Sequence, residues 1–295
     1  MTTGPPAGAV IITGSGSGIG AATAVILARR GYRVVAAAHS RDRVTQLREW
    51  IDGAAADGAG AVAARVDIDE LDVTDEAAIP SFVERVVARH GSLHAVVSNA
   101  GVHGVETFED EDLASYRRVF DVNVFGPVAL LKAAFGHLRA SHGRIVAVGS
   151  VAGVVGLPFM EAYSGSRFAL EGVLESLAPV ARRVGVAVSI VSPGPTGADA
   201  ARKLDWPRIL GAAGPFEAVL RQYVDNAEAS AGPLPGLPAT QTVEAVATAI
   251  ADVLAAADPP FRQPTAPDTA ALLARKLRDL NGDEVQSLVA GWLDP

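Results

Sequence analysis

Short apolar runs alternate with longer amphipathic stretches over residues 8–192. The apolar runs, which we interpret as strands, lie at 10–12, 33–37, 66–71, 95–97, 144–148 and 187–191. Helical spacing of apolar residues predicts helices over 18–30, 41–50, 75–90, 113–140 and 168–183, and small residues predict a loop over 53–60. Strands separated by helices of this length pair in parallel, and strands without polar alternation are covered on both faces. The pattern predicts an α/β fold built on a doubly wound parallel sheet.

The C-terminal third of the chain has a different composition. Of the 18 prolines, 12 lie beyond residue 190, and apolar side chains such as Trp206 and Phe216 are scattered among them. We expect a partly helical segment over 193–240, a helix over 242–257, and a tail over 258–295 with a helix at 268–280. The chain, 1–295, is thus predicted to form one domain in which 193–295 is a helical C-terminal cap.

Composition narrows the range of partners. The net charge of -8 argues against a nucleic-acid surface, and the absence of cysteine excludes disulfides and thiol chemistry. The six histidines show no ligand spacing, so we expect no metal. The start of the chain has no basic region followed by an apolar run, and no uninterrupted apolar stretch approaches the ~20 residues of a spanning helix. We therefore expect a cytoplasmic protein without membrane insertion.

A glycine-rich turn follows the first predicted strand and opens the first predicted helix. It reads Thr13-Gly14-Ser15-Gly16-Ser17-Gly18-Ile19-Gly20. Glycines permit a tight turn and close approach of a pyrophosphate, while the helix N-terminus supplies free N–H groups and a positive dipole. The turn predicts dinucleotide binding through Gly14, Ser15, Ser17, Gly18 and Ile19; an ordinary strand-to-helix turn is the alternative.

The end of the second strand bears on which dinucleotide binds. A site for NAD usually has an acidic residue here, which accepts from the adenine-ribose hydroxyls and repels a 2′-phosphate. This chain has Ala38 instead, followed by His39, Ser40 and Arg41. A hydroxyl and a guanidinium favour NADP(H), with NAD(H) as the alternative. Arg41 as a solvated residue at a helix start is the other interpretation.

Ser150 and Tyr163 stand thirteen residues apart, with Arg167 four residues after the tyrosine. With the glycine turn, Asn99-Ala100-Gly101 and Asn123, this order resembles the short-chain dehydrogenase/reductase family. Further segments, at 149–153, 156–159 and 168–172, resemble its 17-beta-hydroxysteroid and retinol dehydrogenase branch. The resemblance implies a Rossmann-like fold, a nicotinamide cofactor, and ketone or alcohol substrates that are bulky and hydrophobic. It also implies a homodimer or homotetramer formed through helices 113–140 and 163–183.

The resemblance assigns a role to each matching residue. Tyr163 would be the acid or base; because an ordinary tyrosine has a pKa of ~10, it needs a nearby positive charge, and residue 167 shares its helix face. Ser150 would orient the substrate oxygen, and Asn123 would anchor a water in the proton path. The substrate would be lined by 154–160. The remaining cofactor contacts would be Asp72, Val73, Asn99, Ala100, Gly101, Tyr163, Arg167, Pro193, Gly194 and Thr196.

Three positions depart from the family pattern or have a second interpretation. Arg167 stands where the family has lysine, and a guanidinium cannot deprotonate at ordinary pH. The family threonine after Pro193 is Ala198 here, with Thr196 as its substitute, and Asp72 is alternatively a helix N-cap. Three hypotheses follow: an NADP(H)-dependent oxidoreductase, a non-redox acid–base catalyst (isomerase, cyclase or dehydratase), or a catalytically silent nucleotide-binding protein.

Overall fold

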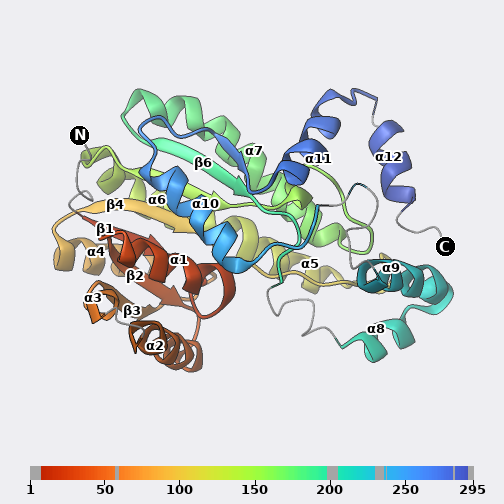
Figure 1. Ribbon diagram of the computed structural model, residues 1–295, viewed down its shortest axis with the longest axis horizontal. Helices are drawn as coiled ribbons and strands as arrows, with labels where there is room; N and C mark the ends of the chain where they lie inside the picture. Colours follow the sequence, from red (N-terminus) through yellow and green to blue (C-terminus); the bar gives the residue numbers. More distant parts are fainter. Residues whose placement is uncertain are drawn as a thin grey trace.

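The computed structural model describes residues 8–56, 60–197, 205–229, 236, 238–281 and 283–291. Its centre is a seven-stranded, all-parallel sheet with the order β3-β2-β1-β4-β5-β6-β7 (Figure 1). The strands are β1 (Ala9–Ile12), β2 (Arg33–Ala38), β3 (Val66–Glu70), β4 (Leu93–Ser98), β5 (Arg144–Val148), β6 (Ala187–Ser192) and β7 (Arg262–Pro264). The predicted doubly wound parallel sheet is confirmed. Its order reverses beside β1, so the turns after β1 and β4 meet at one edge.

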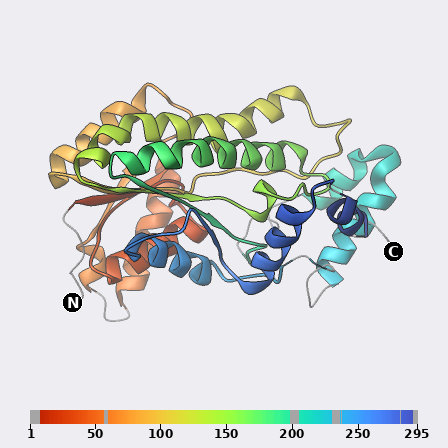
Figure 2. The same ribbon diagram turned by 90° about the horizontal axis from the view of Figure 1, so that it is seen from above.

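Successive strand residues point to opposite sides of the sheet, and here the residues on both sides are apolar. Helices therefore cover both faces. On one face Ile11 packs in a cluster with Phe82 of α4 (Ala78–His90), Leu130 of α6 (Gly126–Ala140) and Leu174 of α7 (Glu161–Arg183). On the other face lie α1 (Gly18–Arg29), α2 (Arg41–Ala56) and α10 (Val243–Ala255), which pack around Val10 and Ile12. Figure 2 shows the two helical layers with the sheet between them. The apolar strands of the sequence are thus explained by burial from both sides.

The structure corrects three details of the sequence prediction. The seventh strand, β7, lies in the stretch expected to be tail, and it pairs with β6 at the sheet edge. The predicted loop over 53–60 is wrong for its first residues, because α2 continues to Ala56 and α3 (Gly60–Ala63) follows. The single helix predicted over 113–140 is interrupted: α5 (Leu113–Phe120) passes through a π-helical turn, η1 (Asp121–Phe125), into α6. Such a turn widens the helix locally and is frequent at functional sites.

This same stretch, Leu113–Ala140, is long and apolar enough to cross a membrane by length and hydropathy alone. However, 44% of its most apolar window is buried inside the protein, and α6 packs on the sheet. A core helix passes the same test, so this one helix is weak support for a membrane span.

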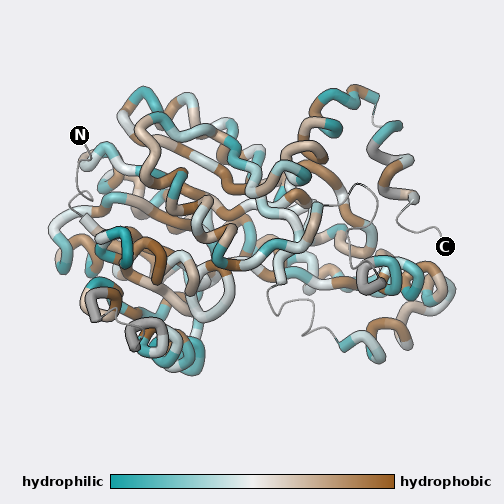
Figure 3. The backbone as a smooth tube through the Cα atoms, in the orientation of Figure 1, coloured by the Kyte–Doolittle hydropathy of each residue, from teal (hydrophilic) through white to brown (hydrophobic). Residues whose placement is uncertain are grey.

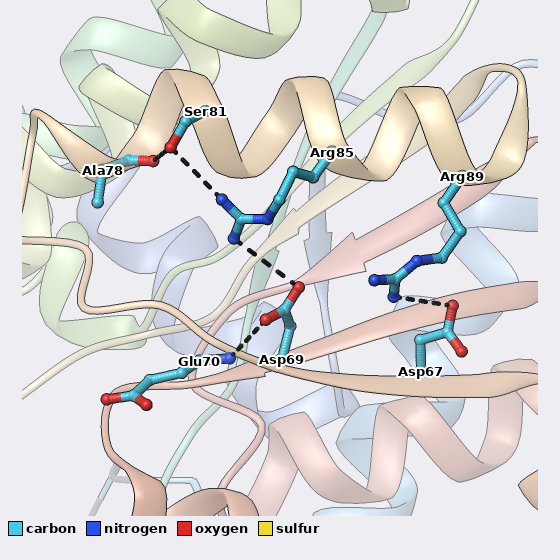
Figure 4. A network of polar contacts seen from close by, with 7 residues as sticks. All are labelled: Asp67, Asp69, Glu70, Ala78, Ser81, Arg85 and Arg89. Atoms are coloured by element: carbon cyan, nitrogen blue, oxygen red, sulfur yellow. Dashed lines mark hydrogen bonds and ion pairs between the residues drawn. The ribbon is translucent and has the colours of Figure 1, made fainter.

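The edge strand β3 is held by charge rather than by apolar packing alone. Figure 4 shows Arg89 and Arg85 reaching from α4 to Asp67 and Asp69 of β3, at 3.4 and 4.0 Å. The main-chain N–H of Glu70 also donates to the Asp69 carboxylate at 3.0 Å. Charged side chains along a sheet edge oppose pairing with a further strand from another molecule. The sheet therefore ends at β3.

The C-terminal part joins the sheet and also extends beyond it. Beyond the carboxyl ends of the strands lie α8 (Trp206–Ala212), the 3-10 turn η4 (Gly214–Phe216), α9 (Glu217–Ala229), α11 (Pro267–Arg278) and α12 (Asp283–Ala290). Their hydropathy alternates around each helix, whereas the strands are more uniformly apolar (Figure 3). Ile209, Leu220 and Val224 pack with Val105 in a separate small core. This core lies on the side of the sheet edge where the predicted site residues gather.

Candidate active site

The turn after β1 has the backbone geometry that its glycines predict. Gly14 and Gly18 have φ angles of 65° and 57°, which side chains rarely adopt. A Cβ at Gly14 would lie 2.6 Å from the Cα of Ala100. Ser17 precedes α1 in an extended conformation and makes no side-chain cap, so the helix start keeps N–H donors for an anion. Ser15 is buried and donates to the Ile12 carbonyl at 2.9 Å, which fixes the turn from inside; Ile19 lies in the first turn of α1.

Thr13 and Asn99 tie this turn to the one after β4. The Thr13 hydroxyl accepts from the main-chain N–H groups of Asn99 and Ala100, both at 3.1 Å. The Asn99 amide donates to the carbonyls of Thr13 and Gly14 at 2.9 and 3.1 Å. The two turns at the point where the strand order reverses are thus joined by four hydrogen bonds. Thr13 was not among the predicted contact residues, and its role here is to hold the turn.

The end of β2 places polar and basic groups beside the glycine turn. His39 is exposed, Ser40 is half-buried, and Arg41 is almost fully exposed, 3.7 Å from Glu70. Arg43, which the sequence prediction omitted, is closer to the turn: its side-chain carbons lie against Gly16, and a Cβ there would meet them at 2.9 Å. Its guanidinium donates to Gln46 at 3.0 Å. A candidate partner for an anion at this end is therefore Arg43 as well as Arg41.

Asp72 and Val73 follow β3. The Asp72 carboxylate accepts from the N–H and hydroxyl of Thr74 at 2.9 and 2.8 Å, which makes a local turn. It does not cap α4, since Asp75 accepts from Ala78 N–H at 3.1 Å. The alternative of Asp72 as an N-cap is therefore wrong. Val73 is buried and packs against Gly126 at the start of α6.

Tyr163 and Arg167 lie one turn apart on α7, and their side chains are in contact. The guanidinium carbon of Arg167 lies 5.2 Å from the centre of the Tyr163 ring. Arg167 is 7% exposed; its Nη1 donates to the Val148 carbonyl at 3.3 Å, and its Nε is buried without a partner. Nη2 occupies the space that a side chain on Gly101 would need. A buried cation thus lies between the tyrosine ring and the turn after β4.

Asn123 is fully buried in the π-helical turn, and all of its side-chain hydrogen bonds go to protein. Its oxygen accepts from the Val102 N–H at 2.8 Å, and its nitrogen donates to the Val102 carbonyl at 2.8 Å and to Ser166 at 2.9 Å. Ser166 in turn donates to the Tyr163 carbonyl at 2.7 Å. The side chain therefore fastens the loop after β4 to α7. The water-anchoring role that the resemblance implies for Asn123 stays a prediction.

Ser150 caps a short 3-10 turn, η2 (Val151–Gly153), which follows β5. Its hydroxyl accepts from the Ala152 N–H at 3.1 Å, and its residue is 9% exposed. Gly153, at the end of η2, lies so near α7 that a Cβ would come within 3.3 Å of the Arg167 carbonyl. Close packing of glycine on the helix thus fixes Ser150's segment against the segment of Tyr163 and Arg167.

His103 also contacts the tyrosine, and the sequence prediction did not include it. The two rings meet edge to face, with centres 5.7 Å apart and planes at 69°. Its Nδ1 is buried without a hydrogen-bond partner, and burial, followed by the charge of Arg167, lowers the pKa of its imidazole. No signal in the sequence distinguishes His103, because its contact with Tyr163 joins two segments sixty residues apart.

The loop after β6 also contacts η2. The carbonyl of Pro193 accepts from Val151 N–H at 2.9 Å, and Gly194 lies against Pro238, Thr269 and Gln241. Thr196 pairs with Gln241 in an isolated parallel bridge. Ala198, the position of the family threonine, lies outside the described residues.

The start of α7 is strongly acidic. Burial raises the pKa of Glu111 to about 7, assisted by repulsion from Glu106 and Glu161, although the Ala162 N–H bonds to this carboxyl. One oxygen of Glu161 is buried without a partner. A helix N-terminus stabilises a nearby negative charge, but three carboxylates close together repel one another.

Apolar side chains from the loop before α7 and from the cap form one cluster. Phe159 and Met160 pack with Trp206 and Tyr223, and the rings of Phe159 and Tyr223 lie 5.8 Å apart. Phe159 has a φ angle of 59°, which is strained for a bulky residue and common at ligand-binding loops. Phe216 is half-buried outside this cluster.

The arrangement combines a dinucleotide-type turn with an acid–base group held beside a buried cation. Four of the predicted residues, Tyr163, Arg167, Gly101 and Asn123, are linked by the contacts above, and Ser150 lies on a turn packed against the same helix. Arg41 and Thr196 are farther out, on the borders of the region. Such a site suits proton transfer to or from a polar group bound near Tyr163.

Comparison with known proteins gives concordant matches. The short chain dehydrogenase family profile matches residues 8–207. Retinol dehydrogenase 8 of Bos taurus is 32% identical over 298 aligned residues, covering 92% of this chain and 86% of that protein. 17-beta-hydroxysteroid dehydrogenase type 1 of Homo sapiens is 37% identical over 190 residues, covering 63% of this chain and only 56% of that protein. Among solved structures, a short-chain dehydrogenase from Streptomyces avermitilis superposes with a TM-score of 0.71 at 27% identity, over 97% of both chains.

Proposed function

This chain belongs to the short-chain dehydrogenase family and to its oxidoreductases, and we propose that it uses NADP(H) to interconvert a ketone and a secondary alcohol on a bulky hydrophobic molecule. Its resemblance to the 17-beta-hydroxysteroid and retinol dehydrogenase branch is confirmed by the relatives above. The observation that carries the proposal is the contact of Tyr163 with the buried Arg167 beside the turn after β4.

The residues present fit a nicotinamide dinucleotide. The unpaired N–H groups at the start of α1 suit the pyrophosphate, and the positive φ of Gly14 lets the backbone approach it. The partnerless buried Nε of Arg167 is a donor without an acceptor, which the hydroxyls of the nicotinamide ribose would satisfy. On the adenine side, Asp72, Val73 and Asn99 would border the base. Near the nicotinamide, Pro193, Gly194 and Thr196 would form the opposite wall.

The choice of NADP(H) rests on charge at the end of β2. Ala38 replaces the acid that would repel a 2′-phosphate, and two arginines, Arg41 and Arg43, lie in the first turn of α2. Arg43 already packs on the glycine turn, so its guanidinium needs only to leave Gln46 to meet a phosphate. His39 and Ser40 add two further hydrogen-bonding groups.

The chain's own residues supply the acid–base chemistry. The reduced cofactor supplies a hydride to the carbonyl carbon when bound. Tyr163 donates its phenol proton to the carbonyl oxygen, and the positive charge of Arg167 stabilises the phenolate that this leaves. The Ser150 hydroxyl oxygen accepts from Ala152, so its hydrogen is available to orient the substrate oxygen. Asn123 keeps the loop after β4 fixed to α7 during this step.

We infer the substrate class from the apolar cluster that the loop before α7 and the cap build together. Phe159, Met160 and Trp206 belong to this cluster, and Met160 precedes α7, the helix that carries Tyr163. We assign residues 193–295 the role of covering this substrate within a single domain. Apolar walls with a few polar groups are typical of small-molecule sites.

Self-association is the remaining part of the proposal. Phe125, Phe168, Val173 and Val180 are exposed on η1 and α7. Exposed apolar side chains on two helices of one layer suit burial against a second copy, in a dimer or tetramer. Light scattering coupled to gel filtration should give a mass of two or four chains. A monomer at micromolar concentration would contradict this part alone.

Calorimetric titration with NADPH and, separately, NADH tests the cofactor. We expect NADPH to bind with a Kd in the low micromolar range, at least ~10-fold tighter than NADH, which corresponds to ~1.4 kcal/mol. Failure to bind either nucleotide would contradict the oxidoreductase proposal. Tight binding of NADH instead would contradict the choice of NADP(H) alone.

Ketone reduction by the Tyr163→Phe variant tests the acid–base role. With a panel of bicyclic and steroid ketones, the wild type should oxidise NADPH, whereas the variant should lose ~100-fold or more in kcat and still bind NADPH. Tyr32→Phe, which alters a buried tyrosine between α1 and the sheet, is the matched control and should retain turnover. If the wild type binds NADPH and turns over no ketone, the non-redox catalyst is favoured. The Arg167→Lys variant then provides a second test. A gain in ketone reduction would indicate a weakened dehydrogenase, and no gain would indicate that the arginine has a function of its own.

A further inference from the structure

A tyrosine that gives its proton to substrate must recover one before the next turnover. Arg167, the charged group on its ring, cannot exchange a proton at ordinary pH, because a guanidinium stays protonated. The second polar side chain in contact with the ring is His103. An imidazole exchanges protons readily near neutral pH.

We propose that His103 carries protons between Tyr163 and solvent. The inference rests on the proposed function, since it presupposes that Tyr163 is the acid or base. His103 acts through Tyr163 and is therefore a positioning and proton-exchange residue rather than a group that touches substrate.

The position of His103 is fixed by its neighbours along the loop. Asn123 binds both main-chain groups of Val102, the N–H and the carbonyl, each at 2.8 Å. The adjacent residue therefore cannot move far from α7, and its ring stays edge to face with Tyr163 at 5.7 Å. Arg167, the other side chain on the tyrosine ring, donates to the Val148 carbonyl at 3.3 Å. Both neighbours of the ring are thus tied to backbone groups by hydrogen bonds of their own or of the adjacent residue.

The protonation state of His103 suits exchange. The ring of Tyr163 contacts the imidazole, and the charged group that acts on it is Arg167 of α7, which repels a second cation. Burial and this repulsion keep the imidazole neutral at pH 7, since both lower its pKa. A neutral imidazole has one donor nitrogen and one acceptor nitrogen. Of the two, Nδ1 is buried without a partner, so one nitrogen has no competing protein hydrogen bond.

The step balances as follows in ketone reduction. The carbonyl π bond breaks as hydride from the reduced nicotinamide reaches carbon, and the carbonyl oxygen takes the proton of Tyr163. The phenolate then takes a proton from one nitrogen of His103, directly or across one water, while the other nitrogen takes a proton from solvent. The imidazole ends neutral, as the opposite tautomer, and Tyr163 ends protonated. Alcohol oxidation runs the same path in reverse.

Rapid-mixing kinetics of the His103→Phe variant test the proposal. Phenylalanine keeps the aromatic contact with Tyr163 and removes both nitrogens. Since Tyr163 begins protonated, the first turnover should proceed at the wild-type rate, with a burst of about one NADPH oxidised per site. Later turnovers should be at least ~10-fold slower, as expected for loss of a proton-transfer partner. A variant with a merely disturbed Tyr163 would slow the first turnover too.

Two further measurements make the result independent of one variant. In His103→Ala, added imidazole should restore steady-state turnover in proportion to its concentration. In the cofactor-free protein, ¹⁵N NMR of the histidine rings should show His103 neutral at pH 7, with a titration midpoint below the usual 6.5 that rises in Arg167→Met. Arg167→Lys should reduce the effect of His103→Phe, because a lysine exchanges protons.

The outcomes separate the inference from the proposed function. If wild-type protein reduces ketones and His103→Phe matches it within twofold at every turnover, the inference is wrong and the proposed function stands. A slowed first turnover, or no rescue of His103→Ala by imidazole, likewise overturns it. If wild-type protein binds NADPH but reduces no ketone, the proposed function fails first and the inference falls with it.

Discussion

The two sides of the site, only a few strands apart on one sheet edge, treat their polar groups in opposite ways. At the turn after β1, the groups that join it to the turn after β4 are paired: the side chains of Thr13 and Asn99 make four hydrogen bonds, two between these residues, one with Ala100 and one with Gly14. Around α7, buried polar atoms lack partners, among them Nε of Arg167 and Nδ1 of His103. The side chains that join the first region are paired, whereas the second region keeps buried side-chain atoms without a hydrogen-bond partner.

The two regions therefore contribute differently to the free energy of the folded protein. A buried donor or acceptor without a partner costs ~1–3 kcal/mol, so natural proteins retain one where it has a use. The paired turn stabilises the fold and presents backbone N–H groups as a by-product. The unpaired atoms around α7 carry a cost in the free protein that a ligand would offset. Substitutions in the paired turn should therefore lower stability, whereas Arg167 substitutions should mainly weaken binding or turnover.

Gly14→Ala should give the largest effect, because it breaks the paired side. The new methyl would need a φ of 65° and would lie 2.6 Å from Ala100 backbone. We expect unfolding free energy to fall by at least ~3 kcal/mol, with NADPH binding lost. Gly53→Ala is the matched control: it lies inside α2 with open space around it and should stabilise by ~0.5–1 kcal/mol. Equal behaviour of the two variants in urea denaturation would refute the requirement for glycine at 14.

Thr13→Val should have the next largest effect on stability. Valine keeps the shape but leaves the N–H groups of Asn99 and Ala100 without their acceptor. Each unsatisfied group costs ~1–3 kcal/mol, and because both of these bonds are only part-buried we expect a loss in the lower part of the summed range, ~2–4 kcal/mol, in urea denaturation. Thr13→Ser keeps the acceptor and should lose less than half as much. If both variants lose the same amount, the methyl group and not the hydroxyl holds the turn.

Arg167→Met should sharpen the contrast from the other side. The arginine is a buried cation with one unsatisfied nitrogen. Its removal destabilises the fold by the loss of a cation–π contact and one bond to Val148, and it stabilises the fold because a charge no longer has to be desolvated. We expect unfolding free energy to change by less than ~1 kcal/mol, while the Kd for NADPH rises ~10-fold or more. Thermal denaturation with and without NADPH measures both. A stability loss as large as that of Thr13→Val would mean that Arg167 is a structural residue.

Much of the fold is predictable from the sequence because its signals are local. Each central strand is an apolar run, and burial on both faces requires that. The edge strand β7 has no such signal: it is three residues long, contains Pro264, and pairs through its backbone with β6. The sequence pattern did not predict helix over residues 53–56 because Gly53 is typical of a loop, although α2 tolerates it.

The candidate site is predictable only as far as its motifs are contiguous. The glycine turn and the Tyr163–Arg167 pair are each readable within a few residues, because turn and helix geometry decide which neighbours meet. Arg43 lies on Gly16, and His103 lies on Tyr163, across long intervals of sequence. Likewise, the side chain of Asn123 faces Val102 only because a π-helical turn carries it inward. Contacts of this kind depend on the packing of separate elements, which no local pattern encodes.

The smallest effect should come from Glu111, where burial of the carboxylate and like charges, rather than missing partners, set the cost. Its pKa in the folded protein is raised to about 7 by burial and by Glu106 and Glu161, against about 4.5 when unfolded. Between these values the folded state binds more protons, so this group's contribution to stability improves as pH falls from about 7 toward 4.5.

Glu111→Gln removes the charge and can still accept from Ala162. We expect it to stabilise by less than ~1 kcal/mol at pH 8, with no difference from wild type below pH 4.5, since the carboxyl is partly exposed and screened. Urea denaturation across this pH range measures the trend, and a gain that is constant with pH would show that shape, not charge, separates the two side chains.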